Sequence, residues 1–171
     1  DQGFSVESTH TVELEDDRVS STRIRNALDD NKFQLAGRLL GHPYTISGCI
    51  VHGRKLGRQL GVPTANVSLG RKVLVLNGVY AVEAELESGS CWQGVANIGV
   101  RPTVDGVQPS LEVHLFGFDG SIYGEHLKVV FRHKIRDEQK FANVDALKEQ
   151  IFNDIEETKT YFDTLSSRNK N

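Results

Sequence analysis

Glycine recurs at every fourth position in one short stretch of the chain, at Gly53, Gly57 and Gly61, and cations lie between these glycines, namely Arg54, Lys55 and Arg58. Glycine lets backbone N–H groups approach phosphate oxygens, and the cations add charge that favours a triphosphate. The chain contains neither the G-x-x-x-x-G-K-[ST] string of a P-loop nor the G-x-G-x-x-G string of a dinucleotide-binding fold. These features alone are equally compatible with a basic hairpin that binds no ligand.

The tetrapeptide Pro63-Thr64-Ala65-Asn66 follows directly. In an extended chain Thr64 and Asn66 point to the same side, so that a hydroxyl and an amide carbonyl converge on one point. Hard, neutral oxygens of this kind suit Mg²⁺, which takes its other ligands from water and substrate phosphates.

Together these residues read Gly-x-x-x-Gly-Arg-x-x-Gly-x-Pro-Thr-Ala-Asn, and this string resembles the signature of the riboflavin kinase family. The resemblance covers roughly Leu40 to Phe162 and continues through Gly78-Val79-Tyr80, Asn97 to Thr103, Leu111 to Leu115 and Lys134 to Phe141. It implies ATP and riboflavin as substrates, ADP and FMN as products, and Mg²⁺ bound with ATP. The nucleotide-binding residues that it implies are Gly53, Lys55, Gly57, Arg58, Gly61 and Thr64, and the metal ligands are Thr64 and Asn66.

Glu112 is the candidate catalytic residue. Strand alternation places Leu111, Val113 and Leu115 on one face and Glu112 with His114 on the other. An exposed strand glutamate usually has no function, but in riboflavin kinases the matching residue is the proposed base for the ribityl 5′-hydroxyl. A metal pair of Glu112 and His114 is the alternative, and the lack of a third ligand at a fitting distance disfavours it.

Charged residues dominate the segment from Arg132 to Phe141, which follows the last predicted strand. Composition alone predicts a solvated loop. The resemblance implies a mobile flap that covers the flavin, with Arg136 and Phe141 on its two sides as flavin-binding residues.

Strand-like runs bounded by turn residues predict a small antiparallel barrel or sandwich, and the runs are Thr45–His52, Gly78–Leu86, Cys91–Ile98, Leu111–Phe118 and Leu127–His133. Turns are expected at Gly89, Arg101-Pro102, Asp105-Gly106 and Asp119-Gly120. A helix capped by Asn143 should carry one apolar stripe of Val144, Leu147, Ile151, Ile155, Thr158 and Phe162. The resemblance narrows the fold to a mainly β protein, a six-stranded antiparallel Greek-key barrel with a C-terminal helix.

The first 40 residues predict two short helices, one starting near Thr22 and one over Lys32–Leu40. Ser20-Ser21-Thr22-Arg23-Ile24-Arg25 resembles the end of the adenylyltransferase module of bifunctional bacterial FAD synthetases. We therefore expect residues 1–40 to be a remnant of that module, 41–165 to be the kinase barrel and 166–171 to be a frayed tail. Without the rest of the module, the chain alone should not adenylylate FMN.

The charge distribution favours an anionic ligand. The net charge is −3, yet no Asp or Glu occurs between Asp30 and Glu83. No apolar run approaches the ~20 residues of a membrane span, and the residues from Asp1 onward lack the basic and apolar regions of a secretion signal, so we expect a cytoplasmic protein without membrane or nucleic-acid partners and of undetermined oligomeric state. The alternative is a noncatalytic barrel that binds nucleotide, flavin or RNA, and the lack of aromatic residues from Gly53 to Lys72 disfavours RNA.

Overall fold

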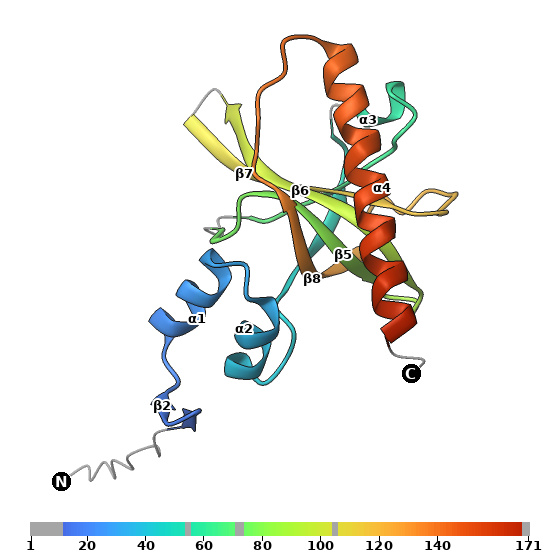
Figure 1. Ribbon diagram of the computed structural model, residues 1–171. Helices are drawn as coiled ribbons and strands as arrows, with labels where there is room; N and C mark the ends of the chain where they lie inside the picture. The colour runs from blue at the N-terminus through green and yellow to red at the C-terminus, as the bar shows by residue number, and fades with distance from the viewer. Residues whose placement is uncertain (1–11, 54–55, 71–73, 104–105, 169–171) are drawn as a thin grey trace, which may run out of the picture.

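The computed structural model of this chain describes residues 12–53, 56–70, 74–103 and 106–168. Six antiparallel strands form a closed barrel in the order β3-β4-β7-β6-β5-β8 (Figure 1). The strands are β3 (Thr45–Val51), β4 (Ala65–Val67), β5 (Gly78–Leu86), β6 (Cys91–Thr103), β7 (Gly106–Leu115) and β8 (His126–Arg136). The predicted six-stranded antiparallel barrel is confirmed.

The order of the strands makes this barrel a Greek key. Strands β5, β6 and β7 form a meander, while β4 pairs with β7 rather than with β5, which follows it in sequence. This crossover places the short strand β4 beside β7, with Asn66 opposite Glu112 and Ala65 opposite Val113. Residues distant in the sequence thus meet on one wall of the barrel.

Alternation along the strands fills the barrel with apolar side chains. On β7 the side chains of Leu111, Val113 and Leu115 are buried, whereas Glu112 and His114 between them are half-buried on the outer face. Tyr80 and Phe131 are among the largest fully buried side chains, and their rings meet edge to face at 5.5 Å. The predicted assignment of strand faces is therefore confirmed.

Two short helices close one end of the barrel. They are α1 (Ser21–Asp29), which Ser20 caps by accepting a hydrogen bond from the Arg23 N–H at 3.2 Å, and α2 (Phe33–Leu40). A two-stranded hairpin of β1 (Glu13–Leu14) and β2 (Asp17–Arg18) precedes them. The Phe33 ring lies 5.9 Å from Tyr80 and 6.4 Å from Phe131, so α2 shares the hydrophobic core of the barrel.

The long helix α4 (Val144–Arg168) lies across the outside of the barrel (Figure 1). Asn143 caps it, as predicted, by accepting a hydrogen bond from the Ala146 N–H at 2.8 Å. Ile155, Thr158 and Phe162 are buried, but Val144 is exposed, so the predicted apolar stripe was wrong at its first position. The helix also includes residues 166–168, which were predicted to belong to a frayed tail.

Strands β6, β7 and β8 are longer than their sequence patterns predicted, and β7 begins at Gly106, where a turn was expected, and ends at Leu115 rather than at Phe118. Strand β6 continues through Arg101-Pro102, where a turn was expected. Beyond Ile98, β6 pairs with β7 alone. A proline there interrupts no hydrogen bonds to a second neighbouring strand. Strand β8 continues to Arg136, so the first half of the predicted Arg132–Phe141 loop is strand. In this part of the strand Arg132 forms an ion pair with Glu83 of β5 at 2.6 Å. None of the helices in the described residues is long and apolar enough to cross a membrane.

Candidate functional site

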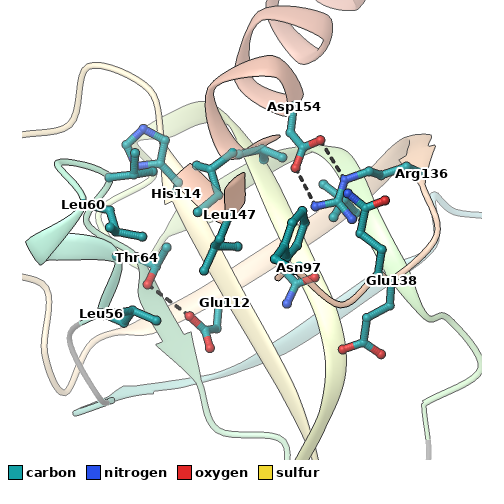
Figure 2. Close-up of a pocket in the computed structure, with 17 residues that line it drawn as sticks. Leu56, Leu60, Thr64, Asn97, Glu112, His114, Arg136, Glu138, Leu147 and Asp154 are labelled. Atoms are coloured by element: carbon teal, nitrogen blue, oxygen red, sulfur yellow. Dashed lines mark hydrogen bonds and ion pairs between the residues drawn. The ribbon is translucent and has the colours of Figure 1, made fainter. Parts of the chain in front are cut away.

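A cavity of about 350 Å³ lies between the outer wall of the barrel, the short helix α3 (Leu56–Gln59) and helix α4. Its wall includes apolar side chains from all three parts, among them Leu60, Val79, Val95, Leu147 and Ile151. Polar side chains enter at two places, Thr64 with Glu112 on one side and Arg136 with Asp154 on the other (Figure 2). An apolar cavity with a few converging polar groups is the usual form of a small-molecule site.

Glu112 lies in this cavity on β7, half-buried, where strand alternation placed it. Thr64 Oγ1 donates a hydrogen bond of 3.3 Å to Glu112 Oε2. The neighbouring strand places Asn97 directly opposite Glu112, and Asn97 also lines the cavity. The candidate base and the end of the glycine-rich loop are thus in direct contact.

The glycines of the loop permit close approaches that a side chain would block. A Cβ at Gly53 would overlap the Asn66 amide, and a Cβ at Gly57 would overlap the Val62 carbonyl oxygen. Gly61 follows helix α3 in the turn, with a φ of +82°. Asn66 itself is buried on β4, and Lys55 lies outside the described residues. The loop therefore folds back so that Gly53 and Asn66, its first and last residues, touch.

A second cavity, of about 270 Å³, borders the first. Thr64 lines both cavities, and Arg58 from the glycine-rich loop lines the second. Tyr123 contributes to its far side and stacks on His52 with ring centroids 3.9 Å apart. Thr64 is thus the lining residue that the two cavities share.

On the opposite side of the first cavity, Arg136 is held by helix α4. Its guanidinium donates two hydrogen bonds of 2.8 Å to the carboxylate of Asp154, whose side chain is 5% exposed. Gln150 donates a third hydrogen bond to Asp154 at 2.9 Å, and the Phe141 ring lies 5.7 Å from the guanidinium carbon of Arg136. The predicted pair of Arg136 and Phe141 therefore lies on one side of the cavity, in contact, rather than on two sides of a flap.

Several cavity residues were not singled out from the sequence. Asp154 was overlooked because a carboxylate on an amphipathic helix normally faces solvent, although its place beside Ile155 and Thr158 on the buried stripe was a usable signal. His114 was considered only as a metal ligand, whereas its Nδ1 lies 2.8 Å from the Pro63 carbonyl oxygen. The described residues contain no group of three His, Cys, Asp or Glu side chains that could hold a metal ion.

Comparison with known proteins shows the family of this chain. The flavokinase family, described as riboflavin kinase, matches residues 40–162. The chain belongs to the riboflavin kinase family. The boundaries of this match agree closely with the range over which the sequence resembles the family.

Individual relatives agree with this membership. The chain is 51% identical over 162 residues to the bifunctional riboflavin kinase/FMN adenylyltransferase of Haemophilus influenzae, covering 95% of this chain and 53% of that protein. It is 50% identical over 160 residues to the protein of the same name from Escherichia coli K12, covering 94% and 51%. The chain thus spans about half the length of the curated relatives that it matches.

Two solved structures share the fold. A Streptococcus pneumoniae protein named as a macrolide-efflux protein superposes with a TM-score of 0.76 at 41% identity, over 87% of this chain and 49% of that one. Riboflavin kinase from Trypanosoma brucei superposes with a TM-score of 0.50 at 23% identity, over 70% and 76%, and supports the fold alone. The family membership rests on the family match and the curated relatives rather than on these names.

Proposed function

We propose that this riboflavin kinase family member transfers the γ-phosphoryl group of MgATP to the 5′-hydroxyl of riboflavin, giving FMN and ADP. The observation that supports this proposal is the junction of two cavities at Thr64, with Glu112 beside it. A phosphoryl transfer between two substrates needs a space for each and a common point where the reacting atoms meet. The remaining residues supply groups suited to each substrate.

The larger cavity suits the acceptor. Its apolar walls and the Phe141 ring offer area to a flat, fused-ring flavin, and Arg136 offers a cation beside them. A flavin bound there can direct its ribityl chain along β7 toward Glu112. In this arrangement Glu112 accepts the proton of the 5′-hydroxyl as the oxygen forms its bond to the γ-phosphorus and the bond to the β-phosphate oxygen breaks, so that ADP leaves.

The glycine-rich loop and the second cavity suit the donor. Arg58 lines this cavity, and glycine at positions 53, 57 and 61 of the loop would let backbone N–H groups approach phosphate oxygens. We place Lys55 in the same role from the family resemblance. Phosphoryl transfer depends mainly on positioning and on neutralising charge, and these groups would supply both.

Thr64 and Asn66 fit a magnesium ion bound with ATP. Both offer neutral oxygens, the donor type that Mg²⁺ prefers, and Asn66 lies opposite Glu112 in the ladder while Thr64 contacts Glu112 directly. When bound, the ion would neutralise charge on the transferring phosphate. Thr64 and Asn66 would orient the donor relative to Glu112.

We also propose that the full-length parent adenylylates FMN to FAD. This proposal rests on the bifunctional names of relatives that are about twice as long and on the resemblance of Ser20–Arg25 to the adenylyltransferase module. Residues 1–40 would then connect the two activities, with the kinase unit starting at residue 41 and continuing to the end of helix α4 at Arg168. We propose a cytoplasmic location for both activities.

The test is a chromatographic assay of the purified chain with riboflavin and MgATP. We expect FMN and ADP in equal amounts, no FAD, and loss of FMN in Glu112→Gln. No FMN from the wild-type chain would refute the kinase proposal. Quenching of riboflavin fluorescence without FMN formation would identify a noncatalytic flavin-binding barrel instead.

A further inference from the structure

His114 lies on β7 two residues beyond Glu112 and on the same face of the strand (Figure 2). Its Nδ1 is 2.8 Å from the carbonyl oxygen of Pro63, a residue 51 positions away in the sequence. A carbonyl oxygen can only accept a hydrogen bond, so Nδ1 carries the hydrogen and donates it. The imidazole therefore holds the backbone of the Pro63-Thr64 segment.

This contact begins where the β-ladder ends. Strand β4 pairs with β7 over Ala65 to Val67 only, and the last pair is Ala65 with Val113. Pro63 and Thr64 lie just beyond that pair, so side chains of β7 rather than ladder hydrogen bonds hold them. His114 contacts Pro63, and Glu112 contacts Thr64.

The two contacts act on one rigid unit. The Pro63 carbonyl and the Thr64 N and Cα belong to the same planar peptide group, and the proline ring restricts the preceding torsion. Holding the Pro63 carbonyl oxygen in place therefore also holds the Thr64 Cα, from which the Thr64 side chain extends. The Thr64 hydroxyl then reaches Glu112 Oε2 at 3.3 Å.

We infer that His114 is a positioning residue, which sets the Thr64 hydroxyl relative to Glu112 through the Pro63 carbonyl. This inference rests on the proposed kinase function, because Thr64 would orient the donor and Glu112 the acceptor. It assigns His114 a role through Nδ1 alone, as the donor to the Pro63 carbonyl oxygen. A misplacement of ~1 Å at such a point can reduce the rate on the order of 100-fold.

Three substitutions at one position test this role. In His114→Asn the amide nitrogen replaces Nδ1 and can still donate to Pro63, whereas in His114→Gln the amide nitrogen lies nearer the Nε2 position. His114→Ala removes the nitrogen at both positions. The control is His42→Ala, because exposed His42 also has its Nδ1 near a proline carbonyl, that of Pro43 at 3.0 Å, far from the cavity.

We expect His114→Asn and His42→Ala to keep kcat within about threefold of wild type. His114→Gln and His114→Ala should lower kcat by roughly 10- to 100-fold. They should also raise the Mg²⁺ concentration for half-maximal rate, while riboflavin binding, measured by fluorescence quenching, should weaken less than kcat falls, because His114 is one of many residues that line the cavity. Circular dichroism and thermal melting check the fold of each variant, and should His114→Ala fail to fold, the comparison of Asn with Gln decides.

The inference is overturned if His114→Asn is as slow as His114→Gln, or if His114→Gln retains activity and His114→Asn does not, because either result excludes a donor at the Nδ1 position. It is also overturned if all variants match the wild-type chain. Failure of the proposed function is a separate result, since it would appear as absence of FMN with the wild-type chain itself.

Discussion

Thr64 Oγ1 donates a 3.3 Å hydrogen bond to Glu112 Oε2 and so joins the end of the glycine-rich loop to the strand that carries the candidate base. The two residues are 48 positions apart in the sequence. The contact is possible because β4 crosses over to pair with β7, which places Asn66 opposite Glu112. It connects the proposed sites of the phosphoryl donor and acceptor.

Replacing Glu112 by Gln removes the proposed base but keeps the size of the side chain. We expect kcat to fall by about 10²- to 10⁴-fold, the usual loss for a general base, with little change in ATP affinity. Glu85→Gln is the control, because Glu85 is paired with Lys128 on the outer surface of the barrel. Steady-state FMN formation measures both, and a Glu112→Gln variant with wild-type turnover would assign the base elsewhere.

Combining Thr64→Ala with Asn66→Ala removes both proposed oxygen ligands of the magnesium ion. The Mg²⁺ concentration for half-maximal rate should then rise by roughly tenfold or more, equivalent to the loss of at least ~1.4 kcal/mol of binding free energy. Thr64→Ser keeps a hydroxyl and serves as the control. A double variant with unchanged Mg²⁺ dependence, in a chain that circular dichroism shows to be folded, would reject the metal assignment.

Asp154→Asn should release Arg136 from helix α4. Loss of one partner of a buried ion pair costs ~3–5 kcal/mol, and we expect about 1–3 kcal/mol here because the Arg136 side chain is 19% exposed and can be partly solvated. Because Arg136 would no longer be held beside Phe141, the KM for riboflavin should rise, by roughly tenfold for the loss of one such contact.

Urea denaturation and FMN-formation kinetics measure the two effects of Asp154→Asn. The control is Glu156→Gln on the same helix, whose partner Lys159 is exposed and whose ion pair should contribute at most ~1 kcal/mol. If Asp154→Asn and Glu156→Gln behave alike, the Arg136–Asp154 pair does not organise the cavity.

Phe33→Ala should show that helix α2 belongs to the folding unit of the barrel. Phe33 is buried against Tyr80 and Phe131, and a buried Phe→Ala change lowers the free energy of unfolding by about 3–5 kcal/mol. Phe152→Ala is the control because Phe152 is 45% exposed on helix α4. Equal denaturation midpoints for the two variants would mean that α2 is not needed to close the barrel.

Tyr80 should make the stability of the barrel sensitive to strongly alkaline pH. Burial raises the pKa of Tyr80 from 10.0 to about 12. The folded chain holds the phenolic proton more tightly than the unfolded chain, so its contribution is complete below pH 10 and is lost as the pH rises toward 12.

Urea denaturation of the wild-type chain and Tyr80→Phe over a pH series tests this. Above pH 10 the wild-type chain should lose free energy of unfolding faster than Tyr80→Phe, because the variant has no phenol at this position to ionise. Parallel curves for the two proteins would contradict the raised pKa.

Many features of this protein follow from the sequence alone. Period-two alternation determined which face of β7 carries Glu112 and His114, because successive side chains of a strand must point to opposite sides. The spacing of glycines before Pro63-Thr64-Ala65-Asn66 identified the loop through its resemblance to the riboflavin kinase signature, because the glycines and cations alone are equally compatible with a hairpin that binds no ligand. Alternation was least informative where charge hid a strand, as in Arg132 to Arg136, where Arg132 and Arg136 pair with carboxylates of β5 and α4.

Only the tertiary structure decided which of these groups meet. Strand period specifies a face but not a partner, so the contacts of His114 with Pro63 and of Asp154 with Arg136 depend on the crossover of β4 and the docking of α4. Each pair joins groups from different elements, and local propensity does not encode such distances. The sequence thus determined the candidate base and its loop, while barrel closure determined that they touch.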